Sequence, residues 1–306
     1  MNWNTDQIPD QSGKLALVTG GNSGIGYWTC LHLARKGARV VMACRSQARA
    51  QAALDKLQAA VPQGQFEILL GDLTDLKSVR DAADNFRSRH QRLDILCLNA
   101  GIALAPMART KDGFESHIGA NFLGHFAFTG HLLDMIRATP GCRVIHVASI
   151  AHHIGRIDLQ DLNFERRPYR AWAAYAQSKL ANLMFMLELE RRFRRAGIDA
   201  ISLGGHPGMA LTNVGSSIPI FTKPGFRSLA AWIQSAVPES SERGAGPMLL
   251  AATMPEAKGG SYFGPDGWME IQGAPAPAKI SAAASEALRA SRLWKLAEGQ
   301  TGVRYL

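Results

Sequence analysis

The chain has 306 residues, of which 46% are hydrophobic and 19% are charged, and its formal net charge is +9. This is the composition of an ordinary soluble globular protein. The positive charge could indicate a nucleic-acid or membrane partner, but the basic residues are scattered. The densest group, between Arg191 and Arg195, falls near the end of a predicted helix, where cations offset the helix dipole. We therefore expect no nucleic-acid partner.

The cysteines and the N-terminal residues indicate in which cellular compartment the protein is expected. The four cysteines lie in apolar segments and form no C-x-x-C pair, which predicts reduced thiols in the core: Cys30, Cys44, Cys97 and Cys142. The N-terminus lacks a basic region followed by an apolar run, and no apolar stretch is long enough to cross a bilayer. We expect a cytoplasmic protein without a membrane span.

Short apolar runs alternate with helix-like stretches along the chain. The expected strands cover residues 14–18, 38–44, 66–70, 93–98, 144–147, 200–203 and 261–263. One expected helix includes residues 52–57. The other expected helices cover about 24–36, 76–88, 113–138, 172–195 and 243–252. Strands joined through helices must run parallel. Seven such strands predict a doubly wound α/β sheet of the Rossmann type, in a single domain over residues 1–306 with its core at about 12–265.

In such sheets, ligands bind beyond the carboxyl ends of the strands. The residues with notable chemistry gather at those ends, in the order of the first six strands: the turn 19–26, Arg45, Asp72, Asn99-Ala100-Gly101, Ser149 and His206-Pro207-Gly208. We therefore expect one ligand site along this edge.

The turn over residues 19–26 lies between the first strand and the first helix. A glycine-rich turn there lets the backbone approach a pyrophosphate and aims a helix N-terminus at its charge. The sequence therefore predicts a dinucleotide site. Its expected members in this turn are Gly20, Asn22, Ser23, Gly24, Ile25 and Gly26.

The residues after the second strand usually decide between NAD and NADP. A carboxylate there binds the ribose diol, whereas an arginine accepts a 2′-phosphate. Here Arg45 follows the strand, no carboxylate is near, and Arg49 comes one turn later. Arg45 could instead be a surface arginine at a helix start, but that position is electrostatically poor for a cation. We expect NADP(H).

Tyr175 and Lys179 are four residues apart, which places them on one face of a predicted helix. Ser149 ends a β-branched run. A tyrosine has an unperturbed pKa of about 10, and a neighbouring cation lowers it. The three groups could exchange a proton with a carbonyl–alcohol pair. Taken alone, the same spacing is also typical of side chains that merely pack on a helix.

Together these segments resemble the short-chain dehydrogenase/reductase (SDR) family over about residues 12–265, and within it the retinol-dehydrogenase and WW-domain-oxidoreductase branch. The matching motifs are T-G-x-x-x-G-I-G at 19–26, Asp72, N-A-G at 99–101, Asn121, Ser149, Y-x-x-x-K at 175–179 and P-G at 207–208.

The resemblance implies a catalytic tetrad of Asn121, Ser149, Tyr175 and Lys179. Tyr175 would exchange a proton with the substrate oxygen, which Ser149 would hold by a hydrogen bond. Lys179 would lower the pKa of Tyr175 and bind the nicotinamide ribose. Asn121 would position a water that relays protons. The further cofactor contacts that it implies are Asp72, Leu73, Asn99, Ala100, Gly101, Tyr175, Pro207, Gly208 and Thr212.

The resemblance also implies a homodimer or homotetramer in which long helices, beginning near Gly113 and Trp172, pair between subunits. The C-terminal tail, about 266–306 with a helix around 282–297, could fold over the site or support a subunit contact. Residues 209–242 are apolar and rich in glycine and proline. They predict either a lid over a lipophilic substrate or a cap on the core.

The histidines offer no metal site. His152 and His153 have no carboxylate or cysteine at ligand spacing, and the H-E-x-x-H motif is absent from the sequence. His152 and His153 follow Ser149 and could touch the substrate. His206 could shape the nicotinamide site, but we favour a structural histidine with satisfied hydrogen bonds. The remaining three on the predicted helix 113–138 are interpreted as ordinary helix residues: His117, His125 and His131.

The leading hypothesis is an NADP(H)-dependent oxidoreductase for a ketone or aldehyde and its alcohol. A sugar-nucleotide epimerase or dehydratase would show G-x-x-G-x-x-G and a larger C-terminal domain. A non-catalytic NADP sensor or scaffold would commonly lack the tyrosine or the lysine, whereas all four tetrad positions are filled here.

Overall fold

The computed structural model describes residues 3–208 and 241–305. Its centre is an eight-stranded sheet with the strand order β3-β2-β1-β4-β5-β6-β7-β8. All neighbouring strands run parallel except β7 and β8. The strands are β1 Leu15–Thr19, β2 Arg39–Cys44, β3 Phe66–Leu70, β4 Ile95–Leu98, β5 Cys142–Val147, β6 Ala200–Gly205, β7 Tyr262–Pro265 and β8 Pro275–Pro277.

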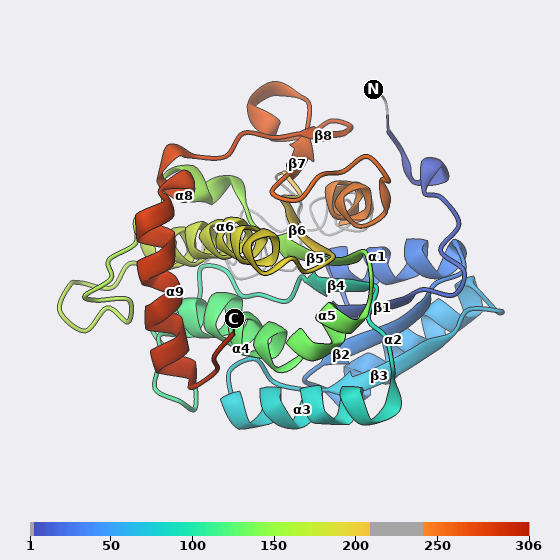
Figure 1. Cartoon of the computed structure of the whole chain (residues 1–306), viewed down its shortest axis with the longest axis horizontal. Coiled ribbons are helices and arrows are strands. Elements are labelled where there is room, and N and C mark those ends of the chain that lie inside the picture. Colours follow the sequence, from blue (N-terminus) through green and yellow to red (C-terminus); the bar gives the residue numbers. More distant parts are fainter. Residues whose placement is uncertain (1–2, 209–240, 306) are drawn as a thin grey trace, which may run out of the picture.

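Helices cover both faces of the sheet (Figure 1). They are α1 Gly24–Arg35, α2 Gln47–Ala60, α3 Leu76–Arg89, α4 Gly124–His131, α5 Leu133–Ala138, α6 Ala171–Ala196, α8 Ala282–Ser285 and α9 Ala287–Thr301, together with a helix over 241–253. The single Rossmann-type sheet confirms the predicted fold class.

Successive side chains along each strand point to opposite faces of the sheet, so the core forms two layers. In β1, Leu15 and Leu17 face a cluster built from α3, α4, α6 and α9. Ala16 and Val18 face the opposite cluster, built from α1, α2 and the helix over 241–253. Successive strand side chains point to opposite faces, so a strand covered on both faces must be apolar throughout. This is why β1 is buried at every position.

The eighth strand was not predicted. β8 pairs antiparallel with β7 at the sheet edge, in a segment rich in alanine and proline. Proline cannot donate to a β-ladder, so it disfavours a strand in a sequence pattern and is tolerated mainly at edges. β8 occupies such an edge.

The single helix expected over residues 113–138 is interrupted. A π-helix runs over Ile118–Leu123, and α4 and α5 are separated at Leu132. The π-turn shows in the bond from Gly124 N to the Gly119 carbonyl, five residues back. A side chain at Gly124 would meet the Leu73 carbonyl, so the backbone of this segment lies close to the end of β3. The sequence periodicity does not reveal such a register change.

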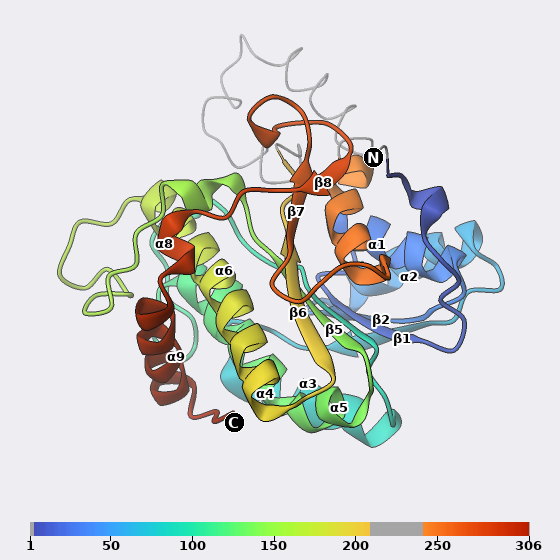
Figure 2. The same cartoon turned by 45° about the horizontal axis from the view of Figure 1, so that its top comes forward.

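The C-terminal helix packs beside α6, as Figures 1 and 2 show. Trp294 of α9 packs edge-on against Phe126 and at a tilt against Phe185, with ring centroids 5.0 and 5.6 Å apart. The Tyr305 hydroxyl donates to the Phe126 carbonyl at 2.5 Å. The tail therefore covers part of α4 and α6, which belong to the helical stretches that the resemblance pairs between subunits.

Two further expectations can be compared with the structure. All four cysteines are free and buried, as predicted for core thiols. Among the described residues, no helix is long and apolar enough to span a membrane.

Candidate functional site

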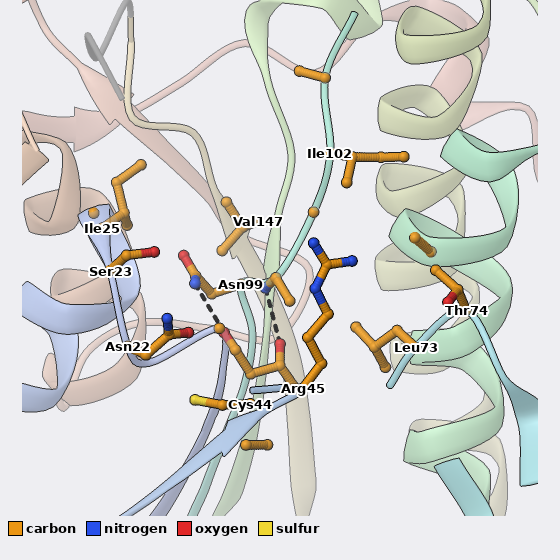
Figure 3. A pocket seen from close by; sticks show the side chains of 18 of the residues that line it. Asn22, Ser23, Ile25, Cys44, Arg45, Leu73, Thr74, Asn99, Ile102 and Val147 are labelled. Carbon is orange, nitrogen blue, oxygen red and sulfur yellow. Dashed lines mark hydrogen bonds between the residues drawn. The ribbon is translucent and has the colours of Figure 1, made fainter. Parts of the chain in front are cut away.

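A cleft of about 470 Å³ opens at the carboxyl ends of the parallel strands (Figure 3). It brings together most of the residues singled out in the sequence, from six strand ends and from the helices α1 and α6: Gly20, Asn22, Ser23, Gly24, Ile25, Arg45, Asp72, Leu73, Asn99, Ala100, Gly101, Ser149, Tyr175, Lys179, Pro207 and Gly208. Gly26 and Asn121 lie behind this lining. Thr212, like residues 209–240 of the expected lid, lies outside the described residues.

The glycine turn folds tightly against the strand beside it. Gly20 has a φ of +68°, a conformation that side chains disfavour. A Cβ on Gly26 would lie 2.3 Å from the Gly20 carbonyl oxygen, so the start of α1 can approach the turn only without a side chain. Asn99 Nδ2 donates to the Thr19 carbonyl at 2.8 Å, and Figure 3 shows this bond. These contacts hold the turn open toward the cleft.

The N-terminus of α1 is suited to an anion. Ser23 is its N-cap residue and makes no side-chain capping bond to the first-turn amides of this described helix. Those amides and the helix dipole therefore remain available to a phosphate. Together with the glycine turn, which a Cβ would block, this arrangement fits the pyrophosphate of a dinucleotide.

Two guanidinium groups line the cleft at the end of β2. Arg45 extends into it in Figure 3, and Arg49 follows on the first turn of α2. Among the described residues, neither pairs with a carboxylate. The nearby Asp72 is already engaged, because its Oδ1 accepts from the Thr74 backbone N–H and hydroxyl at 2.9 and 2.8 Å. This end of the cleft is therefore suited to a second anionic group.

At the other end of the cleft, α6 places Lys179 against the end of β5. Its Nζ donates to the Val147 carbonyl at 3.0 Å and lies 5.8 Å from the centre of the Tyr175 ring. Burial lowers the pKa of Lys179 to about 8. The ammonium is therefore held next to the reactive groups at a fixed position.

The side chains of Tyr175 and Ser149 both line the cleft, and Ser149 Oγ accepts from Ala151 N at 3.2 Å. Burial raises the pKa of Tyr175, and the Ser149 hydroxyl offsets only part of that effect. This direction is opposite to the expected effect of Lys179. A phenol is protonated at neutral pH with or without this shift, so Tyr175 carries a proton that it can donate.

Asn121 lies in the π-helix and uses its whole side chain internally. Its Oδ1 accepts from Ile102 N at 2.8 Å, and its Nδ2 donates to the Ile102 carbonyl at 3.0 Å and to Ser178 Oγ at 2.9 Å. Its own carbonyl accepts from His125 Nδ1 at 3.0 Å. Asn121 thus fixes the chain after β4 to the helix that follows.

The structure gives several histidines contacts that sequence reasoning did not foresee. His125, interpreted as an ordinary helix residue, joins the Asn121 carbonyl to Thr19 Oγ1, which lies 2.9 Å from its Nε2. Burial lowers the pKa of His125 to about 4, so the ring is neutral. The i, i+4 spacing from Asn121 to His125 is present in the sequence, but the contact with Thr19 joins segments 106 residues apart and cannot be predicted from spacing.

His152 and His206 hold the backbone of the site. His152 Nδ1 donates to the Ser149 carbonyl at 2.6 Å. His206 Nδ1 accepts from Gly208 N at 3.2 Å, and its Nε2 donates to Glu270 at 2.9 Å. Within the described part of the chain, no group of three or more metal-binding side chains gathers.

Comparisons with known proteins agree with this geometry. The model of the short chain dehydrogenase family matches residues 14–220. Human retinol dehydrogenase 13 is 38% identical over 284 residues, covering 92% of this chain and 82% of that protein. Mouse retinol dehydrogenase 12 is 41% identical over 208 residues, and the chain spans 64% of its length. A crystal structure of an uncharacterised Mycobacterium paratuberculosis protein is 38% identical, with a TM-score of 0.83 over the whole of both chains.

Proposed function

Because the chain belongs to the short-chain dehydrogenase/reductase family, in its retinol dehydrogenase branch, we propose that it is an NADP(H)-dependent oxidoreductase interconverting a ketone or aldehyde and its alcohol. The observation that carries this proposal is the shape of one continuous cleft. Ser149 and Tyr175 stand at one end, and Arg45 and Arg49, which pair with no carboxylate among the described residues, stand at the other, with the glycine turn between them.

The residues of the site divide the work of carbonyl reduction. Tyr175, protonated at neutral pH, donates its proton to the carbonyl oxygen. Ser149 donates a hydrogen bond to the same oxygen and stabilises the charge that develops there. Lys179 would hold the nicotinamide ribose, and the glycine turn with the N-terminus of α1 would hold the pyrophosphate. The bound dinucleotide supplies the hydride.

The preference for NADP(H) rests on Arg45. In the family fold, a carboxylate at the end of β2 would bind the ribose diol, and here the cleft presents Arg45 and Arg49 instead. A guanidinium can bind a phosphate through two parallel hydrogen bonds. We assign Arg45 to the 2′-phosphate, with Arg49 beside it.

The substrate end of the cleft favours a lipophilic molecule. Ile102 and Ala103 line it. Trp172 is half exposed, and its ring centroid lies 6.1 Å from that of Tyr175. An apolar wall beside one proton donor suits a substrate with a single polar group, such as a lipophilic aldehyde or aromatic ketone.

The test combines cofactor binding with a substrate panel. Purified protein would be titrated with NADPH and NADH, then assayed with retinaldehyde, aromatic ketones, medium-chain aldehydes and sugars, with Tyr175→Phe as the inactive control. We expect tighter binding of NADPH and activity on the lipophilic carbonyls. NADPH binding without reduction of any carbonyl would overturn the enzyme proposal and favour the non-catalytic sensor. Activity on sugars alone would overturn the lipophilic assignment.

A further inference from the structure

The segment that follows β4 is held by side chains at two places. At Ile102, both backbone polar groups bond to the Asn121 side chain. At Ala105, the N–H donates to His117 Nε2 at 3.2 Å, and the carbonyl accepts from the Tyr169 hydroxyl at 2.7 Å. A loop whose backbone groups are taken by side chains in this way has little freedom to shift.

A buried carboxylate sets the tautomer of His117. Glu115 and His117 are both fully buried, and Glu115 Oε1 accepts from His117 Nδ1 at 2.8 Å. Burial raises the pKa of Glu115, but hydrogen bonds from His117 and Ile118 outweigh it and lower the pKa below its usual value. The carboxylate is therefore ionised and Nδ1 carries the proton. This leaves Nε2 as an acceptor for the Ala105 N–H.

The loop between these two attachments is strained. Leu104 has a φ of +53°, in the left-handed region that branched side chains seldom occupy. Such a conformation persists only where the surroundings determine it. The bonds to Ala105 come directly after Leu104, so they are placed to hold it.

The strained loop forms part of the catalytic cleft. Ile102 and Ala103 line the cleft. The ring of His117 also lies edge-on to that of Tyr175, with centroids 6.3 Å apart. Asn121 and His117 are four residues apart, so one face of the segment before α4 supports both attachments. A change at His117 would therefore reach the wall of the site without touching the cofactor end.

We propose that Glu115, His117 and Tyr169 form a clamp on Ala105 that fixes the wall for the carbonyl substrate, and that His117 is a positioning residue for that substrate. This inference rests on the proposed function. The three residues act through the loop: Glu115 orients the imidazole, His117 holds the Ala105 N–H, and Tyr169 holds its carbonyl. Loss of the clamp releases Leu104, and the wall formed by Ile102 and Ala103 loses its fixed position.

Two substitutions of His117 separate the clamp from a general structural role. Glutamine places its amide near the position of Nε2 and keeps an acceptor for Ala105, whereas asparagine reaches only the position of Nδ1 and keeps the donor to Glu115. We expect His117→Asn to raise the KM for the carbonyl substrate about five- to tenfold, as for one lost hydrogen bond, with kcat and NADPH affinity little changed. We expect His117→Gln to remain near wild type. Tyr169→Phe, which removes only the hydroxyl, should resemble His117→Asn.

Amide hydrogen exchange supplies a readout that needs no activity. The Ala105 N–H should exchange slowly in wild type and in His117→Gln, and much faster in His117→Asn, while amides of β4 stay protected. Equal exchange at Ala105 in the two variants, or equal KM values, would overturn the clamp. If wild type reduces no carbonyl but the exchange pattern holds, the proposed function fails and so does substrate positioning, while the contact itself stands.

Discussion

Lys179 donates from its Nζ to the Val147 carbonyl oxygen at 3.0 Å, in a buried setting at the end of β5. The same carbonyl also accepts from Asn182 Nδ2 at 3.2 Å, so it keeps a partner if the lysine is removed. The Lys179 ammonium is therefore buried without being needed as a hydrogen-bond donor to the Val147 carbonyl, because Asn182 also supplies a donor. A group held in this way lowers stability while it is charged.

We therefore expect Lys179→Met to raise the free energy of unfolding at pH 7 and to abolish catalysis. The sign follows from the pKa, which burial lowers from 10.5 to about 8. Between these values, the unfolded chain binds more protons than the folded one, so wild-type stability increases as pH rises. The advantage of the methionine variant should be largest below pH 8 and shrink toward pH 10.5, which denaturant unfolding across that range would measure. An advantage that does not depend on pH would contradict this account.

Tyr175→Phe should lower the rate of carbonyl reduction by about 10²- to 10⁴-fold, the usual contribution of a general acid. NADPH affinity should change little, because phenylalanine keeps the aromatic ring and leaves Lys179, the proposed contact to the nicotinamide ribose, in place. Because burial raises the pKa of Tyr175, kcat/KM for reduction by wild type should not fall through loss of this proton until the pH exceeds the ordinary tyrosine range. A fall near neutrality that Tyr175→Phe removes would contradict the raised pKa.

Arg45→Ala should weaken NADPH binding by about 10- to 100-fold, as for a charge-assisted hydrogen bond, and leave NADH binding unchanged. Arg35→Ala provides a matched control, because it removes the same charge from an exposed position at the far end of α1. Fluorescence titration with both cofactors measures each affinity. Equal losses in the two variants would indicate that net charge, and not a specific contact, attracts the cofactor.

Trp294→Ala should destabilise the protein by about 3–5 kcal/mol, because a large side chain is removed from a packed interior. Trp294 is 2% exposed and contacts aromatic rings of α4 and α6. Trp268→Ala is the control, since that side chain is 80% exposed and should cost less than about 0.5 kcal/mol. Denaturant midpoints compare the two. Similar losses would show that α9 adds little to the core.

The acid side of the stability curve should depend on buried neutral histidines. Burial lowers the pKa of His146 from 6.5 to about 3, so between these values the unfolded chain binds a proton that the folded chain does not. Stability should therefore fall as pH decreases through this range. His146→Gln places an amide near the Nε2 that contacts Ser202 Oγ at 3.0 Å, and it cannot titrate. Its stability should fall less steeply with acid than that of wild type, and an unchanged slope would contradict the prediction.

The order of strands and helices was predictable because each element carries its own local pattern. The strands β1 to β7 appear within a few residues of their expected ranges, since buried parallel strands are continuous apolar runs. β8 and the π-turn at Asn121 were not predictable. The first is defined by an edge partner, and the second by one extra residue in a helical turn.

The candidate site likewise has features that the local sequence predicts and features that depend on distant segments. Its members were predictable because the carboxyl ends of parallel strands meet at one edge, whichever side chains they carry. The roles of His117, His125 and His206 were not, because each depends on a distant partner, as His206 depends on Glu270, 64 residues later. Sequence spacing reports which residues share a helix face or follow a strand. It does not report which buried polar groups meet across elements.

By itself, the sequence determined the doubly wound sheet, the position of the cleft and the residue types along it. Those features follow from local periodicity and from the rule that parallel strands place their ends together. The tertiary structure decided the raised pKa of Tyr175, the lowered pKa of Lys179 and the clamp on Ala105. Each of these depends on burial and on hydrogen bonds between separate segments, which exist only once the chain has folded.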